Sequence, residues 1–311
     1  MKKSVPLDPY FVARMAPLQE LTVVDLTDPE KARVLMDYYS DLDGWSLPEG
    51  VLVEDATIQG LAGVVPVRVY RPASTARAAL LWLHGGGFSQ GSLDMAESHV
   101  VCAELASRAD ALVVAVDYRV AVDGVHFPAP VDDAVTAWSW LLKQWDGAGV
   151  SAIGGASAGA AIAMSAALRL TGSRRPDQLL LAYPFVHFPV PALDFATAGD
   201  LDALPPLMRF NAEAVLSMVK TYVGRITNIP VDALPGAADL SGLPPTRIVI
   251  AELDDLRSSG DLLERQLREA GVAVISHLAQ GMPHGHLNRG TALHEVPRTL
   301  DFFATALRAN V

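Results

Sequence analysis

The sequence predicts an α/β fold with a mostly parallel central sheet, helices on both faces of that sheet, and a helical cap. Along most of the chain, short apolar runs rich in β-branched residues alternate with longer segments of helical periodicity. Of the 311 residues, 50% are hydrophobic, which is enough to bury a large core. One long stretch, residues 185–243, breaks the alternation and contains no convincing strand.

The first 49 residues are expected to be helical and loop-like. The segment Thr27-Asp28-Pro29-Glu30 is typical of a helix start, because it offers a capping side chain, an early proline and an early acid. The helix itself is expected over Lys31–Tyr39, where apolar side chains recur at helical spacing. The period then changes, and the β-branched segments Val51–Ile58 and Val64–Tyr70 predict an antiparallel pair.

After this pair, strands and helices follow one another in turn. Such an order indicates parallel strands joined by helices that cover both faces of the sheet. The expected strands are Ala79–Leu83, Ala111–Asp117, Val150–Gly154, Gln178–Ala182, Thr246–Ala251 and Val272–His277. The expected helices are Ser92–Arg108, Val131–Trp145, Ala158–Leu170, Ser258–Ala270 and Thr291–Ala309.

The stretch over residues 185–243 is rich in Pro, Leu, Ala and Phe, with a helix expected around Asn211–Tyr222. A long insertion of this kind is usually a lid or a binding element. We expect it to form a cap together with residues 1–49, over a catalytic domain made of residues 50–184 and 244–311. Peripheral packing of the two segments is the alternative.

The overall charge restricts the kinds of partner. A formal net charge of -11 argues against nucleic acid and anionic membrane surfaces. No window reaches the roughly 18 uninterrupted apolar residues that a membrane helix needs, and the two lysines at the start are not followed by the apolar region of a signal peptide. Cys102 is the only cysteine, so no disulfide within the chain can form, and a cytoplasmic location is expected.

The segment His84-Gly85-Gly86-Gly87 directly follows an apolar strand. Glycine has no Cβ, so consecutive glycines let the backbone turn tightly and direct N–H groups toward a ligand. Such donors can stabilise negative charge that develops on a carbonyl oxygen. By itself, a run of glycines also fits a flexible turn.

A second motif indicates that the glycine run belongs to a catalytic site. Gly155-Ala156-Ser157-Ala158-Gly159 lies between a strand-like and a helix-like segment, which is the context of a nucleophile elbow. The elbow exposes the hydroxyl of Ser157, and the N–H of Ala158 is a natural oxyanion donor. Together the two motifs predict acyl transfer through a serine.

Serine needs a base to take its proton, and the base needs a carboxylate to orient it. His284 follows the last expected strand, and His286 is its rival. His277 lies within a strand, where packing is the simpler role, and His84 is expected to fix the glycine turn by hydrogen bonds. The acid should follow the preceding strand, where position alone leaves Glu252, Asp254 and Asp255 open.

The motifs together resemble those of the hormone-sensitive-lipase-like bacterial carboxylesterases, which have the α/β-hydrolase fold. The similarity covers roughly residues 65–311 and keeps the order of the family. It rests on His84-Gly85-Gly86-Gly87, Val116-Asp117-Tyr118-Arg119, Phe127-Pro128-Ala129, the Ser157 elbow, the Asp254 segment and Gly281-Met282-Pro283-His284-Gly285.

The resemblance implies roles for individual residues. Ser157 is the nucleophile, His284 the base and Asp254 the acid, while Gly86, Gly87 and Ala158 supply the oxyanion donors. The family's Asp-Pro-Leu-Arg-Asp motif matches Asp254-Asp255-Leu256-Arg257-Ser258, which selects Asp254 over Asp255. Asp255 therefore replaces a proline and places two carboxylates side by side.

Other departures surround the expected site. Ala156 stands where the family usually has Asp or Thr, and His286 replaces a phenylalanine. The family's Tyr-Arg-Leu-Ala-Pro-Glu-His stretch corresponds to residues 118–126, a segment that is longer here. These changes leave the catalytic groups in place, so we expect them to affect the shape of the pocket.

The resemblance implies hydrolysis of small-molecule esters with short to medium acyl chains and no cofactor or metal. It also suggests a homodimer through Val272–His277 and the C-terminal helix. Amides, lactones, thioesters and carbamates are alternative substrates for the same triad. A non-enzymatic ligand receptor on the same fold is a further alternative, because fold does not determine function.

Overall fold

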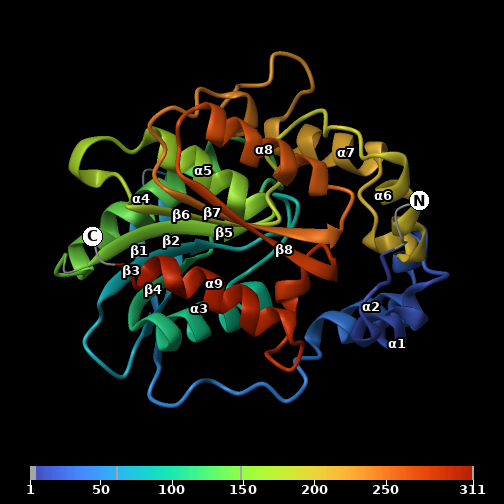
Figure 1. Ribbon diagram of the computed structural model, residues 1–311, viewed down its shortest axis with the longest axis horizontal. Helices are drawn as coiled ribbons and strands as arrows, with labels where there is room; N and C mark the ends of the chain where they lie inside the picture. The colour runs from blue at the N-terminus through green and yellow to red at the C-terminus, as the bar shows by residue number, and fades with distance from the viewer. Residues whose placement is uncertain (1–4, 61, 148, 310–311) are drawn as a thin grey trace.

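The computed structural model describes residues 5–60, 62–147 and 149–309. Within them, eight strands form one sheet in the order β1-β2-β4-β3-β5-β6-β7-β8 (Figure 1). The strands are β1 (Leu52–Gly60), β2 (Gly63–Arg71), β3 (Ala78–Leu83), β4 (Ala111–Val116), β5 (Val150–Ala156), β6 (Gln178–Ala182), β7 (Thr246–Leu253) and β8 (Val274–Pro283). Both pairings of β2 are antiparallel and the other pairings are parallel, so the expected α/β fold with a mostly parallel sheet is confirmed.

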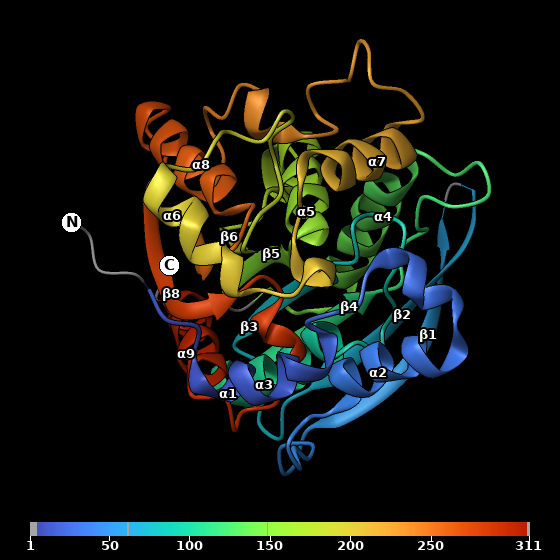
Figure 2. The same ribbon diagram turned by 90° about the vertical axis from the view of Figure 1, so that its right-hand side faces the viewer.

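Helices cover both faces of the sheet. In Figures 1 and 2, α3 and α9 lie together on one face, and α4, α5 and α8 lie on the other. The α-helices of the described residues are α1 (Pro9–Met15), α2 (Pro29–Ser40), α3 (Ala96–Ala109), α4 (Ala129–Gln144), α5 (Ala158–Arg169), α6 (Phe195–Asp200), α7 (Ala212–Val223), α8 (Arg257–Glu269) and α9 (Glu295–Leu307). As the sequence predicts, Asp28 caps α2 and Pro29 is its first residue.

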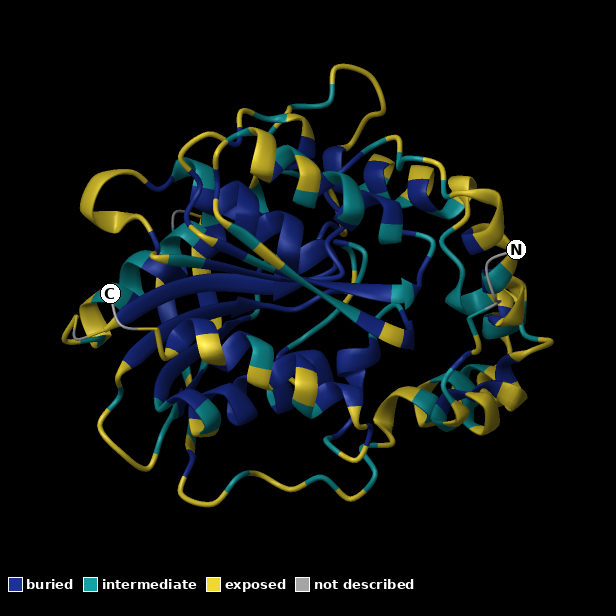
Figure 3. Ribbon diagram, in the orientation of Figure 1, coloured by how far each residue is buried: buried dark blue, intermediate teal, exposed yellow. Residues whose placement is uncertain are grey.

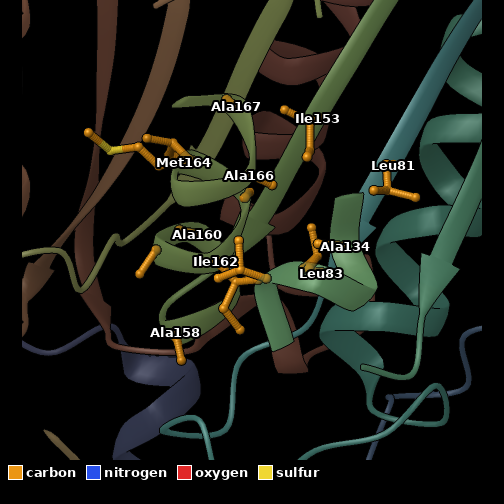
Figure 4. Packing of buried hydrophobic residues seen from close by; sticks show 14 of the residues in the cluster. Leu81, Leu83, Ala134, Ile153, Ala158, Ala160, Ile162, Met164, Ala166 and Ala167 are labelled. Carbon is orange, nitrogen blue, oxygen red and sulfur yellow. The ribbon is translucent and has the colours of Figure 1, made fainter. Parts of the chain in front are cut away.

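The sheet divides the core into two hydrophobic clusters, one on each face. Side chains alternate along a strand, so Leu81 and Leu83 of β3 pack on the side of α4 and α5, whereas Leu80 and Trp82 pack on the side of α3 and α9. Figure 4 shows Leu81 and Leu83 in one cluster with Ala134 of α4 and the labelled residues of α5, and Figure 3 shows the central strands buried along their length. Burial on both faces explains why these strands read as continuous apolar runs.

The structure corrects the end of the last strand. The sequence predicts Val272–His277, but β8 runs six residues further, to Pro283. Of the extra residues, Leu278, Ala279 and Pro283 pair with β7. Proline is tolerated at this position because β8 is an edge strand of the described sheet, where a strand can lack an N–H donor on its outer side. The sequence predicts an earlier end because Gly281 and Pro283 are residue types typical of loops.

Smaller differences concern the starts of two helices. α3 begins at Ala96 rather than Ser92, and α9 spans Glu295–Leu307 rather than Thr291–Ala309. The short helix α6 was not predicted; the side chain of Asp194 caps it by accepting from the N–H of Thr197. The helix expected near Asn211–Tyr222 is α7, for which Asn211 is the N-cap.

The N-terminal segment and the 185–243 insertion lie side by side beyond the end of the sheet (Figures 1 and 2). The hydroxyl of Tyr39 lies 3.7 Å from the sulfur of Met208, and the amide of Gln19 donates to the carbonyl of Ala203 at 3.3 Å. The division into a cap and a catalytic domain stays a prediction.

No helix in the described part of the chain has both the length and the apolar character needed to cross a membrane. β8 is an edge strand of the sheet, which leaves one side of it available for pairing. The expected homodimer stays a prediction.

Candidate active site

Ser157 lies at a sharp turn between the last residue of β5 and the first residue of α5. Its φ of 53° is positive, which is uncommon for a residue with a side chain and is a feature of strained turns at functional sites. The flanking glycines are required by space: a Cβ at Gly159 would lie 2.2 Å from the carbonyl oxygen of Leu83, and one at Gly155 would lie 2.6 Å from the same oxygen. The Gly-x-Ser-x-Gly pattern is thus explained by close packing of this turn against β3.

The three side chains predicted as a triad meet in one hydrogen-bonded chain. Nε2 of His284 lies 2.8 Å from Oγ of Ser157, and Nδ1 of His284 lies 2.6 Å from Oδ2 of Asp254. The other oxygen of Asp254 accepts from the N–H of Leu256 at 2.8 Å. Ser157, His284 and Asp254 follow β5, β8 and β7, so parallel strands bring residues distant in sequence to one edge of the sheet.

The other two candidate carboxylates bind elsewhere. Glu252 accepts from the N–H of Gly281 at 2.9 Å. Asp255 pairs with Arg209, with its Oδ2 3.0 Å from Nε of the guanidinium. Within the described part of the chain, neither carboxylate forms a hydrogen bond with the imidazole of His284, so the geometry distinguishes three acids that position in the sequence leaves open.

The other histidines also have separate surroundings. His286 is buried, its Nε2 lies 3.3 Å from the hydroxyl of Thr299, and burial lowers its pKa to about 3. His277 of β8 has a polar partner in addition to its place in the strand, because its Nε2 lies 2.5 Å from Oε1 of the buried Glu295 of α9. His84 donates from Nδ1 to the carbonyl of Gly85 at 2.7 Å, in agreement with its expected role in the turn.

The glycine turn after β3 lies against the nucleophile. A Cβ placed at Gly85 would be 3.2 Å from the Cβ of Ser157. Gly86 and Gly87 have φ values of 110° and 58°, conformations that favour glycine. Ala158 is the first residue of α5, where an N–H has no partner within the helix. The three expected oxyanion donors therefore belong to two segments that border Ser157.

The charges around His284 favour its protonated form. Burial alone would lower the pKa of the imidazole, because the cation loses hydration. The negative charge of Asp254, its hydrogen bond and the charge of Glu97 act in the opposite direction, and the pKa is raised above its ordinary value. A base with this environment accepts a proton readily and stabilises the resulting cation.

Sequence reasoning missed Glu97, a buried acid on α3. Its Oε1 accepts from the N–H of Gly85 at 2.7 Å, and its Oε2 accepts from the hydroxyl of Tyr183 at 2.6 Å. The Tyr183 ring in turn lies 4.8 Å from the ring of His284. Burial raises the pKa of Glu97, and its two hydrogen bonds oppose that rise. Glu97 could have been identified from the sequence, because it is an acid on the apolar face of a predicted helix, three residues before Val100.

We expect Glu97→Gln to shift the acid limb of kcat/KM to lower pH and to lower kcat by about tenfold. Removal of this negative charge lowers the pKa of His284, and a glutamine amide cannot accept from both Gly85 and Tyr183. The measurement is the pH profile of ester hydrolysis. Glu104→Gln is the matched control, because Glu104 is also on α3 but bonds to Trp45 and Arg108. An unshifted profile in Glu97→Gln would refute this role.

Side chains from the 185–243 insertion cover the triad. The ring of Phe210 lies 4.6 Å from the ring of His284. Met218 of α7 lies over the glycine turn, since a Cβ at Gly87 would be 2.9 Å from its sulfur. Ser157 is only 7% exposed. Neither Phe210 nor Met218 could be selected from sequence, because apolar residues in this stretch fit core packing equally well.

The arrangement can transfer a proton from Ser157 to His284 beside a turn of backbone N–H groups. Over residues 5–60, 62–147 and 149–309, no three or more His, Cys, Asp or Glu side chains cluster in a way that could hold a metal ion.

Comparison with known proteins gives the family. A family model for the alpha/beta hydrolase fold (Abhydrolase_3) matches residues 80–288. An ethyl acetate hydrolase of Pseudomonas putida is 30% identical over 301 residues, 91% of each chain. Esterase LipI of Mycobacterium tuberculosis is 34% identical over 248 residues, 76% of this chain and 75% of its own.

Comparison with solved structures supports the same family. A hyperthermophilic esterase from the archaeon Pyrobaculum calidifontis superposes with a TM-score of 0.78 at 29% identity, over 97% of this chain and 98% of that one. The chain therefore belongs to the α/β-hydrolase family, and the resemblance to hormone-sensitive-lipase-like carboxylesterases that its motifs predict is confirmed.

Proposed function

We propose that this chain is a serine carboxylesterase that hydrolyses short- to medium-chain acyl esters through an acyl-enzyme. The observation that carries the proposal is the hydrogen-bonded chain from Ser157 through His284 to Asp254, next to the glycine turn. The names of the relatives, an ethyl acetate hydrolase and esterases, support ester hydrolysis as the reaction.

In the first half-reaction, Oγ of Ser157 attacks the ester carbonyl carbon and gives its proton to Nε2 of His284. Asp254 accepts from Nδ1, which leaves the lone pair of Nε2 facing the serine. The carbonyl oxygen becomes an oxyanion, which accepts hydrogen bonds from the backbone N–H groups of Gly86, Gly87 and Ala158. The C–O bond to the alcohol then breaks, and His284 protonates the departing oxygen.

In the second half-reaction, water attacks the acyl-enzyme. His284 takes a proton from the water, a second oxyanion forms at the same donors, and the bond to Oγ of Ser157 breaks as the proton returns to it. Removal of one oxyanion donor generally costs about 10²–10³ in turnover. The carboxylic acid product leaves, and the triad is ready for another cycle.

The covering side chains support a small acyl pocket, with the insertion acting as a cap. Phe210 packs against His284 and Met218 lies over Gly87, so both sides of the nucleophile are restricted. We test the proposal with p-nitrophenyl esters from acetate to palmitate. Activity should peak at short chains; folded protein that hydrolyses none of them would contradict the proposal and turn attention to amides, lactones, thioesters and carbamates.

We expect Met218→Ala to shift the preferred acyl chain to greater length, because it removes the side chain above the glycine turn. The ratio of kcat/KM for decanoate to that for acetate should rise about tenfold, the size of effect of removing a few apolar groups from a pocket wall. Leu216→Ala is the control: Leu216 is on the same helix and is 39% exposed. An equal change in both variants would show that loosening of α7, rather than space at the site, is responsible.

A further inference from the structure

Asp255 has contacts that the proposed mechanism does not use. Its carboxylate forms a bidentate pair with Arg209, Oδ2 to Nε at 3.0 Å and Oδ1 to Nη2 at 3.1 Å. Oδ2 also accepts from the N–H of Phe210 at 2.8 Å. Both partners belong to the 185–243 insertion, and the Asp255 side chain is 14% exposed. Three hydrogen bonds thus join the loop after β7 to the insertion.

One turn fixes Asp254 and Asp255 in different directions. The N–H of Arg257 donates to the carbonyl of Asp254 at 3.1 Å, which closes a turn over residues 254–257. Within it, the Asp254 side chain reaches His284, while the Asp255 side chain reaches Arg209. The two adjacent carboxylates therefore do not compete for the imidazole.

The partners of Asp255 are themselves tied to the site. The ring of Phe210 lies 4.6 Å from that of His284, in an edge-to-face arrangement. Arg209 also donates to the carbonyl of Leu201 at 3.0 Å, so its guanidinium links Asp255 to a second point of the insertion. A bidentate, partly buried pair of this kind is stronger than an exposed ion pair.

We propose that Asp255 is a positioning residue that, through Arg209 and the N–H of Phe210, holds the Phe210 ring against His284 and so limits the size of the acyl ester that reaches Ser157. The inference rests on the proposed esterase function. It also assigns a role to the carboxylate of Asp255, at the position where the family motif has proline.

Two variants break the contact in independent ways. Asp255→Pro removes the carboxylate at the second position of the turn, where proline is favoured, so the loop should keep its shape. Arg209→Gln removes the guanidinium and leaves the turn untouched. Asp202→Asn is the matched control, because Asp202 faces the same guanidinium at 3.8 Å but its side chain is 83% exposed.

Both variants should lower the ratio of kcat/KM for p-nitrophenyl acetate to that for decanoate by about tenfold, as expected when a charge-assisted contact at a pocket wall is lost. The double variant should lower it no further, because both changes remove one interaction. Labelling of Ser157 by a long-chain fluorophosphonate should accelerate relative to a small one, whereas Asp202→Asn should match the wild type in both assays.

The proposal fails if Asp255→Pro and Arg209→Gln keep the wild-type ratio and labelling rates, even with a lower melting temperature, because the pair would then be structural only. In that case the wild type still hydrolyses acetate through Ser157, and the esterase function stands. If the wild type hydrolyses no ester, the proposed function itself fails and this inference fails with it.

Discussion

Ser157→Ala is expected to lower kcat for p-nitrophenyl acetate by about 10⁵- to 10⁶-fold, the loss seen when a serine hydrolase is left without its nucleophile. Oγ of Ser157 lies 2.8 Å from Nε2 of His284, and among the described residues no other hydroxyl forms a hydrogen bond with that nitrogen. Binding and the oxyanion donors would remain and would account for the residual rate. The measurement is steady-state release of p-nitrophenol.

Ser165→Ala is the matched control for this variant. Ser165 lies on α5, two helical turns after the elbow, and its buried hydroxyl donates to the carbonyls of Ala161 and Asp232. Its loss should reduce stability by about 1 kcal/mol and leave kcat of the folded enzyme unchanged. A Ser157→Ala variant that kept most of its activity would mean that another group is the nucleophile.

Asp254→Asn is expected to lower kcat by about 10⁴-fold, because an asparagine amide can donate to Nδ1 and so favour the tautomer whose Nε2 already carries a proton. The fold should be little affected, since the remaining oxygen can still accept from the N–H of Leu256. The negative charge of Asp254 raises the pKa of His284, so the acid limb of the residual activity should also move to lower pH.

Glu252→Gln distinguishes this role from a general effect of the loop. Glu252 lies in β7, two residues before Asp254, but its carboxylate accepts from the N–H of Gly281 rather than from His284. Its activity should stay close to that of the wild type at neutral pH. A loss as large as that of Asp254→Asn would show that the assignment of the acid is wrong.

The fold was predictable because its signals are local. Each central strand is a short apolar run, and the elbow at Ser157 combines a strand, a serine between glycines and an alanine-rich helix within about twenty residues of sequence. The glycines are required by contacts so close that only hydrogen fits, as at Gly159. Such steric requirements fix the residue type at these positions and can therefore be recognised in the sequence.

The rest of the candidate site depends on long-range packing, which produces no local pattern in the sequence. Three carboxylates lie at the carboxyl end of β7, and only the direction of each side chain distinguishes Glu252, Asp254 and Asp255. One partner of Asp255 is Phe210, 45 residues earlier, and one partner of Glu97 is Tyr183, 86 residues later. The end of β8 was likewise set by pairing with β7 rather than by its own residues.

The most direct test of the central claim is covalent labelling. Folded protein is treated with a fluorophosphonate, and the modified residue is identified by mass spectrometry of its peptides. A single adduct on Ser157, formed in parallel with loss of ester hydrolysis, is the predicted result. An adduct at another residue, or none on protein that remains folded, would contradict the assignment of Ser157 as the nucleophile.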